Sequence, residues 1–336
     1  MTVALGTVCV FAASVATPAA DALEPTPGTL SDIQAVAPEV LVDVATIERG
    51  IGSRAAIEFR QGADEVVVPL DPADGILLSG AGGDLGIGLP NSDDASQGEV
   101  LAGGIVAYEN GDGSTTVPVL KDDGSVQIVT VIEEPTAPHR YEYVLHLPVG
   151  ATIELAKEGH IVIWDIDGNL LAGAVAPWAT GADGSAVTTY FEVDGSTLVQ
   201  IVEHEPTTAF PVIADPWLGK NLFGKVEKNR RGLFQKKATY SSVLSTWGTA
   251  VYTGIAQGGG IAGSVAGHAI LRDAGWSELK SRLVGSSPAA TLKQQYDCHV
   301  LGGYAVWMSG VHWDLELARP NNPNWLKGVD KHKCNW

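Results

Sequence analysis

The chain has 336 residues, which is long enough for two domains with buried cores or for three small ones. A hydrophobic content of 45% is ordinary for a globular protein, while 40 glycines and only 18% charged residues favour short strands joined by tight turns. With a net charge of −18, nothing in the composition indicates a nucleic-acid partner.

The charge is divided unevenly along the chain. Through Pro216 there are 6 Lys+Arg against 32 Asp+Glu, a net of −26, and from Trp217 onward there are 15 against 7, a net of +8. Such an asymmetry suggests that the two parts attract each other, or that the basic part meets an anionic partner. The simpler alternative for the acidic part is that its charge keeps an exported protein soluble.

The first 22 residues are predicted to form a signal peptide. Val3 to Ala16 is an uncharged apolar run of the right length, too short to span a bilayer as a helix, and the cleavage pattern Ala20-Asp-Ala22 follows. A basic region before the run is missing, which a start codon further upstream would explain. We therefore expect a secreted protein, extracellular or cell-wall associated, without a stable membrane span after cleavage. Loss of Cys9 would leave two cysteines in an oxidising compartment.

The region from residue 51 to 216 is predicted to be an acidic all-β body built from hairpins. Before it, residues 23–50 are rich in Pro, Ala and Thr and are expected to form a flexible leading segment. Six Asp-Gly pairs, which supply the positive φ angles of hairpin turns, begin at residues 74, 112, 123, 167, 183 and 194. A break near 134–140 would divide the body into two subdomains.

The strands of this body are predicted from short β-type runs. They are Ala55–Phe59, Glu65–Pro69, Gly104–Tyr108, Thr116–Leu120, Val126–Ile132, Tyr141–Leu147, Thr152–Leu155, His160–Asp165, Val187–Val193 and Thr197–Glu203. The acidic stretch Asp165 to Asn169 lacks the spacing and the distal Glu of a calcium-binding loop, so we expect a turn there.

A change of composition follows the body. Residues 217–237 carry seven Lys+Arg between Lys220 and Lys237 and are predicted to be a basic linker. With Val144-Leu-His-Leu-Pro148 early and Phe210-Pro-Val-Ile-Ala-Asp-Pro-Trp217 at the end, residues 141–217 as a whole resemble a module common in exported actinobacterial proteins, and this resemblance implies no function. Beyond the linker, Gly259, Gly263 and Gly267 form a small-residue ridge, for which a buried hairpin or close-packed helix is favoured over a membrane segment. Residues 269–283 are predicted to be a helix.

Four short motifs occur in order near the end of the chain. They are Gly275-Trp-Ser-Glu-Leu279, Gln295-Tyr-Asp-Cys-His299, Trp313-Asp-Leu-Glu316 with Arg319-Pro320, and Cys334-Asn335. Together they resemble an uncharacterised secreted actinobacterial domain, catalogued as a domain of unknown function, family 2599. The resemblance covers about the last 100 residues and implies secretion and a paired Cys298 and Cys334, but no activity. At Thr249 this chain departs from the family, which tends to have an arginine there.

The adjacent Cys298 and His299 could be read as a nucleophile and its base. Neighbouring residues on a strand point to opposite faces, however, so a disulfide between Cys298 and Cys334 is the better interpretation. A Cys₂His₂ zinc site with His299 and His332 stays open as an alternative, although the spacings do not match the usual ligand pairs.

Candidate catalytic residues come from the same region. Trp313 to Glu316 alternates with period two, so Asp314 and Glu316 would share one face of a strand, with Arg319 just beyond and His299 able to join them. Two carboxylates and a cation could form an acid/base pair or a cation site. A surface cluster of ion pairs is the more common case.

The predicted fold is therefore mainly β: a hairpin-rich body, followed by a small disulfide-closed α+β domain at 238–336. The first hypothesis for function is a secreted or cell-surface protein whose basic domain binds an anionic envelope component or a protein partner. The alternative is a secreted hydrolase or toxin-like enzyme that uses His299, Asp314, Glu316 and Arg319, with the acidic body as an inhibitory region. No cofactor is indicated, and whether the protein is an enzyme stays open.

Overall fold

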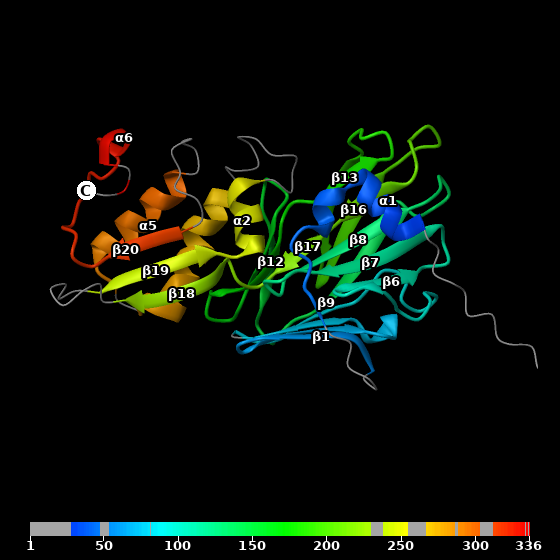
Figure 1. Ribbon diagram of the computed structural model, residues 1–336, viewed down its shortest axis with the longest axis horizontal. Coiled ribbons are helices and arrows are strands. Elements are labelled where there is room, and N and C mark those ends of the chain that lie inside the picture. Colours follow the sequence, from blue (N-terminus) through cyan, green and yellow to red (C-terminus); the bar gives the residue numbers. More distant parts are fainter. Residues whose placement is uncertain are drawn as a thin grey trace, which may run out of the picture.

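The computed structural model describes residues 28–47, 54–80, 82–229, 238–254, 267–285, 288–302, 312–332, 334 and 336. Figure 1 shows an elongated molecule in which a β-rich body lies beside a smaller domain that contains most of the helices. We call residues 28–219 the body and residues 223–336 the C-terminal domain. The architecture is mainly β with a helical C-terminal region, which confirms the predicted class. The expected signal peptide lies outside the described residues.

Two antiparallel sheets form the described part of the body. The first has seven strands in the order β1-β2-β3-β4-β9-β15-β14. Their bounds are β1 Ala55–Gln61, β2 Asp64–Pro69, β3 Ile76–Ser79, β4 Leu85–Ile87, β9 Arg140–His146, β14 Thr188–Asp194 and β15 Thr197–Glu203. Strand β9 alternates strictly between buried and exposed residues, so it presents one face to the core and one to solvent.

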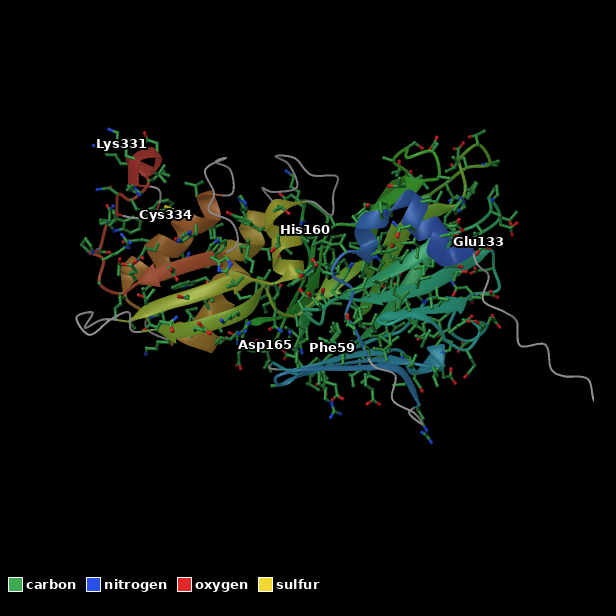
Figure 2. All side chains as sticks on the ribbon, in the orientation of Figure 1. Phe59, Glu133, His160, Asp165, Lys331 and Cys334 are labelled. Atoms are coloured by element: carbon green, nitrogen blue, oxygen red, sulfur yellow. A yellow bond between two sulfur atoms is a disulfide. The ribbon has the colours of Figure 1, made fainter. Side chains whose placement is uncertain are left out.

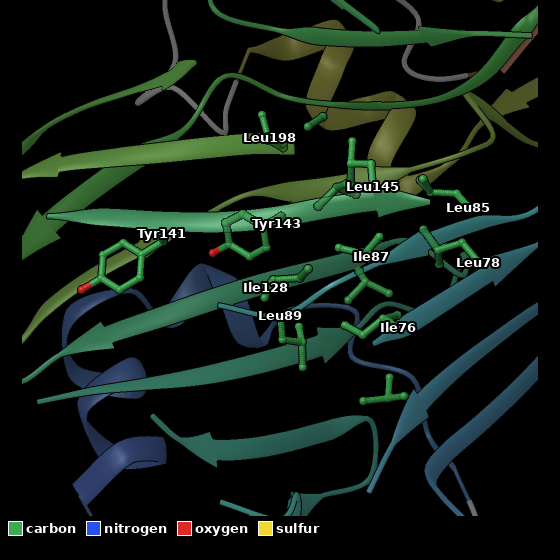
Figure 3. Close-up of a cluster of buried hydrophobic side chains, with 14 of the residues drawn as sticks. Ile76, Leu78, Leu85, Ile87, Leu89, Ile128, Tyr141, Tyr143, Leu145 and Leu198 are labelled. Carbon is green, nitrogen blue, oxygen red and sulfur yellow. The ribbon is translucent and has the colours of Figure 1, made fainter. Parts of the chain in front are cut away.

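The second sheet of the body has ten strands, eight of them in the order β10-β11-β12-β17-β8-β7-β6-β5, while β16 pairs with both β8 and β13. The bounds are β5 Glu99–Ala102, β6 Ile105–Glu109, β7 Ser114–Leu120, β8 Val126–Ile132, β10 Thr152–Leu155, β11 Ile161–Trp164, β12 Leu170–Ala174, β13 Trp178–Gly181, β16 Val212–Asp215 and β17 Trp217–Gly219. Aromatic and aliphatic side chains from both sheets meet in the main core, among them Tyr143 and Ile128 (Figure 3).

The predicted subdomain break near 134–140 is wrong, because both sheets contain strands from either side of it. Strand β9 pairs with β4, and β8 pairs with β16 and β17. Residues around 134–140 only carry the chain from one sheet to the other.

The expectation of a flexible leading segment is also wrong for the part that is described. Helix α1 (Gly28–Val36) and the 3₁₀ turn η1 (Pro38–Leu41) cover the outer face of β7 and β8, where Ile33, Ala37 and Val40 are fully buried. Their spacing of four and three residues is a helical period. This packing explains why every residue of β7 and β8 is buried.

All six Asp-Gly pairs form turns with a left-handed glycine, with φ values between 59° at Gly195 and 82° at Gly113. Five of these turns join strands that are neighbours in a sheet, as between β7 and β8. In the turn at Asp165 the carboxylate accepts from the main-chain amides of Asp167 and Asn169. The turn predicted in place of a calcium loop is confirmed.

The C-terminal domain begins without the predicted linker, because residues 217–229 are mostly strand. The chain leaves β17 of the body and enters β18 (Phe223–Asn229) after three residues. Strand β18 pairs with β19 (Thr239–Leu244), and β19 pairs with β20 (His312–Glu316). Residues 230–237 of the expected linker lie outside the described residues.

Helices cover one face of this small sheet (Figure 1). They are α2 Thr246–Thr253, a helical run composed of η4 Leu271–Gly275, α4 Trp276–Leu279 and η5 Lys280–Val284, then α5 Ala290–Gly302 and the short α6 Val329–His332. The predicted helix at 269–283 is confirmed, although η4 and η5 have π-helical geometry. Gly259 and Gly263 lie outside the described residues, within which no helix is long and apolar enough to cross a membrane.

Candidate functional site

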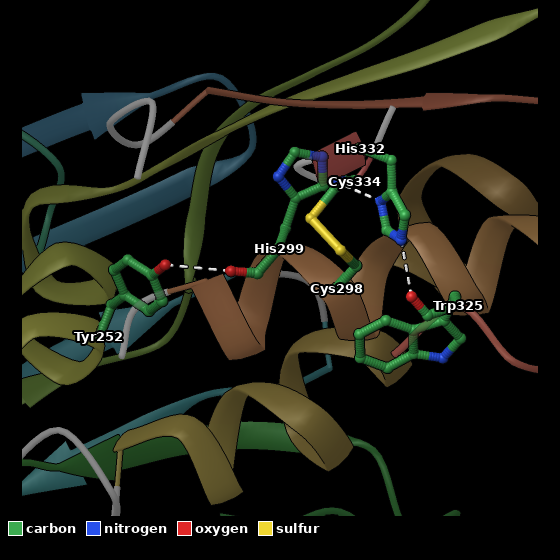
Figure 4. The surroundings of a disulfide bond; sticks show 6 residues. All are labelled: Tyr252, Cys298, His299, Trp325, His332 and Cys334. Atoms are coloured by element: carbon green, nitrogen blue, oxygen red, sulfur yellow. Dashed lines mark hydrogen bonds between the residues drawn. A yellow bond between two sulfur atoms is a disulfide. The ribbon is translucent and has the colours of Figure 1, made fainter. Parts of the chain in front are cut away.

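Cys298 and Cys334 form a disulfide, as predicted, with their Cα atoms 5.6 Å apart. Cys298 lies on helix α5, not on the strand assumed from the sequence. Because the disulfide uses both thiols, the Cys₂His₂ zinc alternative is excluded. The His332 ring instead forms hydrogen bonds with the main-chain oxygen of Trp325 and the main-chain N–H of Cys334, beside the disulfide (Figure 4). Among the residues that the structure describes, no group of three or more His, Cys, Asp or Glu side chains could hold a metal ion.

Helix α5 supplies two side chains to the main chain of strand β20. The amide group of Gln295 donates to the main-chain oxygen of Glu316 at 3.0 Å and accepts from its main-chain N–H at 2.8 Å. One helical turn later, the His299 ring forms a hydrogen bond with the main chain of Asp314 and stacks on Trp313, with ring centres 5.7 Å apart. These contacts give the outer strand of the sheet hydrogen-bond partners that a neighbouring strand would otherwise supply.

The three charged candidates on and beyond β20 are engaged locally. Trp313 and Leu315 are buried, as the alternation predicted, and Asp314 and Glu316 are half-buried on the other face. Asp314 accepts from the Ser241 hydroxyl, and Glu316 pairs with Arg319 at 3.1 Å. Arg319 also donates to the main-chain oxygen of Trp336 at 2.8 Å.

The motif around Gly275 fixes the beginning of the C-terminal domain. Glu278 is buried, and its carboxylate accepts from the main-chain amides of Leu222 and of Phe223, the first residue of β18, while pairing with Arg282. Gly275 leaves room for Tyr296, because a Cβ at that position would be 2.4 Å from the tyrosine hydroxyl. Leu279 is fully buried. The motifs that the sequence singled out thus form a structural framework.

The four candidate catalytic residues are only partly brought together. Glu316 and Arg319 are in contact, Asp314 lies on the same strand, and His299 approaches from helix α5 on the side of Trp313. Burial lowers the pKa of His299 to about 4, so its ring is neutral near pH 7.

This pKa predicts acid sensitivity. In the unfolded chain a histidine binds its proton near pH 6.5, whereas in the folded protein His299 does so only near pH 4. The neutral His299 ring therefore makes its full contribution to the free energy of unfolding above pH 6.5, and this contribution is lost as the pH falls through 4. We expect the difference in free energy of unfolding between the native protein and His299→Gln to shrink by about 2–3 kcal/mol from pH 7 to pH 4 in urea titrations. Parallel pH profiles would contradict this, since the other buried histidines titrate in both proteins.

A different site lies where the turn η1, the strands of the body and helix α2 of the C-terminal domain meet. This junction cavity has a volume of about 440 Å³. Its walls come from five places in the chain: Glu39, Val42 and Asp43; Lys121 and Gln127; Trp178, Thr180 and Ala186; Trp217; and Thr246, Thr249, Ala250 and Thr253 of helix α2. None of His299, Asp314, Glu316 or Arg319 lines it.

Lys121 is the central charged group of the junction cavity. It is 1% exposed, and its ammonium donates to the main-chain oxygens of Val40 and Val42, in the latter case at 3.1 Å. The same ammonium lies 5.3 Å from the centre of the Trp217 ring. Burial lowers the pKa of Lys121 to about 8, opposed by nearby carboxylates, of which Asp215 has the largest effect. Lys121 therefore remains mostly charged at neutral pH.

A second buried group lies behind the wall. Gln127 lines the cavity and donates to the carboxylate of Asp215, which is fully buried. Burial raises the pKa of Asp215 to about 7. Perturbed titratable groups beside a cavity with aromatic walls are typical of binding and active sites.

Helix α2 joins this site to the body through its N-terminus. Asp123 accepts from the main-chain amide of Trp247 at 2.7 Å, and Asp122 accepts from the Thr246 hydroxyl at 3.2 Å. Carboxylates are favoured at helix N-termini, where main-chain amides lack partners within the helix. The Asp-Gly turn between β7 and β8 therefore also positions the α2 wall of the junction cavity.

Sequence reasoning missed the junction cavity. The two signals that touched it were Trp217, at the end of the exported-module resemblance, and Thr249, where the chain departs from the family 2599 pattern; both line the cavity. Nothing in the sequence indicated that Lys121 is buried beside a cavity, because a single lysine next to two aspartates predicts an exposed turn.

Figure 2 shows that Cys334 and Lys331 lie at the end of the C-terminal domain far from Glu133 of the body. Neither cysteine lines the junction cavity, so the disulfide and the cavity are separate features of the molecule. Comparisons of the chain with protein-family models, with curated proteins and with solved structures found no match.

Proposed function

We propose that this protein is an exported binding protein and that the junction cavity holds its ligand. The observation that carries the proposal is the cavity itself, about 440 Å³ in volume, with two tryptophans, a row of threonines and the buried Lys121 in its walls. Ligand sites are concave, mostly apolar and furnished with a few placed polar groups, and they occur preferentially where domains meet.

Export is supported by the disulfide between Cys298 and Cys334, since disulfides persist in oxidising compartments. Cleavage of a signal peptide after Ala22, and kinship with the secreted actinobacterial family 2599, belong to the same proposal. The four family motifs gain a physical reason here, because Glu278, Gln295 and the disulfide hold the C-terminal domain together.

Binding is favoured over the hydrolase alternative by the state of the candidate catalytic residues. His299 is half-buried with a neutral ring at pH 7, and Glu316 and Arg319 are paired with each other. A binding role for the basic C-terminal domain towards an anionic envelope component or a protein partner stays a prediction. Exposed Lys225 and Lys228 on β18 are among the described cations that such a partner would meet.

The proposal is tested by blocking the junction cavity. Thr249→Arg places a long cationic side chain in the cavity, whereas Thr152→Arg, at an exposed position on β10, is the matched control. We expect fragments found by ligand-observed NMR on the full-length protein to lose binding to Thr249→Arg by about tenfold or more and to keep it with Thr152→Arg. A fragment screen without hits, or hits that bind both variants equally, would contradict the proposal.

A further inference from the structure

We infer that the ligand of the junction cavity is a neutral carbohydrate, an inference that rests on the proposed function and names the chemical class of its ligand. The cavity combines flat aromatic walls with groups that both donate and accept hydrogen bonds, and its walls carry charges of both signs, two carboxylates and one ammonium. Each of these properties excludes a different class of small molecule.

The aromatic walls favour a ring with an apolar face. Trp178 and Trp217 both line the cavity and are half-buried. The indole of Trp217 is held in place from two sides, because its N–H donates to the Ser125 hydroxyl at 2.9 Å and Lys121 lies over its ring. Sugar rings carry C–H groups that pack against the faces of indole rings. A tryptophan side chain offers such a ring a large and rigid contact area.

The polar walls favour ligand hydroxyl groups. Among the residues that the structure describes, the hydroxyls of Thr180 and Thr249 have no hydrogen-bond partner, and both residues line the cavity. Thr253 also lines the cavity, and its hydroxyl donates to the main-chain oxygen of Thr249 at 2.8 Å. A hydroxyl both donates and accepts, so these side chains match the hydroxyls of a sugar in either direction.

The charges argue against both an ion and a lipid. Glu39 and Asp43 line the cavity together with Lys121, so an anionic ligand would meet two carboxylates and a cationic one the ammonium. A purely apolar ligand would remove water from these charged groups without replacing its hydrogen bonds. A neutral ligand rich in hydroxyls can bind to groups of both signs.

The test uses defined probes on the full-length protein. Glucose, galactose, mannose, N-acetylglucosamine and their β-1,4-linked disaccharides are compared with glucuronate, as the anionic probe, and with cyclohexanol, as the apolar probe. Saturation-transfer NMR and calorimetry report binding. We expect at least one neutral sugar to bind and to compete with the fragments that Thr249→Arg excludes, while glucuronate and cyclohexanol bind more weakly by about tenfold or more.

Three variants locate the contact. Trp178→Ala should weaken sugar binding by about tenfold or more, because it removes a stacking wall. Trp325→Ala, a half-buried tryptophan outside the junction cavity, should leave binding unchanged. If Trp178→Ala does not fold, Thr249→Val replaces only the hydroxyl with a methyl group and should weaken binding by about threefold or more.

The outcomes separate this inference from the proposed function. If Thr249→Arg excludes fragments but no sugar binds, or if glucuronate or cyclohexanol binds best, the carbohydrate inference fails and the ligand-binding function stands. If Thr249→Arg excludes nothing, both fail. A sugar that binds Trp178→Ala and Thr249→Val as well as it binds the native protein is bound elsewhere, and this overturns the inference.

Discussion

Trp247→Ala is expected to lower the free energy of unfolding by about 3–5 kcal/mol, the range for deletion of a buried tryptophan side chain. Trp247 is 2% exposed and lies in the first turn of helix α2 of the C-terminal domain, but it packs against the body. A Cβ at Gly219 of β17 would lie 2.4 Å from its indole, and one at Gly173 of β12 would lie 3.3 Å from it. The two parts of the molecule therefore share one core, which also includes Val162 and Val175 of the body.

The same contact can be tested from the glycine side. Gly219→Ala should destabilise the protein by about 1–3 kcal/mol, because the added methyl group must displace the indole. Gly224→Ala, five residues later, is the matched control, since its Cβ would meet its nearest atom at 3.6 Å. Urea titrations followed by tryptophan fluorescence measure all three variants. A loss below about 1 kcal/mol for Trp247→Ala would show that the two parts do not depend on each other.

Local signals in the sequence predicted most of the body. Val126–Ile132, Thr152–Leu155 and Thr197–Glu203 are observed with the predicted bounds, because each is a β-type run bounded by turn residues. Strands β3, β4 and β12 were missed, because they are three to five residues long and lack that contrast. A short strand is defined by its partners in the sheet, and those partners are distant in sequence.

Long-range pairing could not be predicted from composition. The shift in net charge at Pro216 suggested a linker, yet β17 on one side and β18 on the other are separated by three residues. Similarly, the proline-rich beginning concealed the helical spacing of Ile33, Ala37 and Val40, whose burial depends on the face of a sheet formed later in the chain. The junction cavity needs five separated segments at once, so no local pattern could reveal it.

The polar residues of the terminal motifs show the opposite case, in which the sequence singled out residues whose observed contacts hold the fold together. Unusual polar residues between aromatic residues suggest a catalytic role. In the structure, however, Gln295 forms its hydrogen bonds with the main chain of β20, and Glu278 forms its own with the main chain where β18 begins. Buried main-chain amides without partners are costly, so a small sheet with an outer strand requires such side chains.

Removal of the disulfide is the second change with a large expected effect. Cys298 and Cys334 are separated by 36 residues, and in the chain-entropy model closure of such a loop stabilises the folded state by about 3–4 kcal/mol. The paired Cys298→Ala/Cys334→Ala variant and the reduced native protein should therefore lose this amount in urea titrations. In the oxidised native protein, thiol counting after unfolding should detect none from Cys298 and Cys334.

The location of the effect distinguishes the disulfide from a general loss of packing. Two hydrogen bonds also hold the segment that contains Cys334. Arg319 donates to the main-chain oxygen of Trp336 at 2.8 Å, and the Trp336 indole donates to the main-chain oxygen of Pro320 at 3.0 Å. Because two such exposed or half-buried bonds contribute only about 1–2 kcal/mol, hydrogen exchange should increase at residues 312–336 after reduction and stay unchanged in the body strands β7 and β8. Fragment binding in the junction cavity should survive reduction, since none of its walls comes from residues 288–336. An equal rise in exchange throughout the body would instead mean that the disulfide supports the shared core around Trp247.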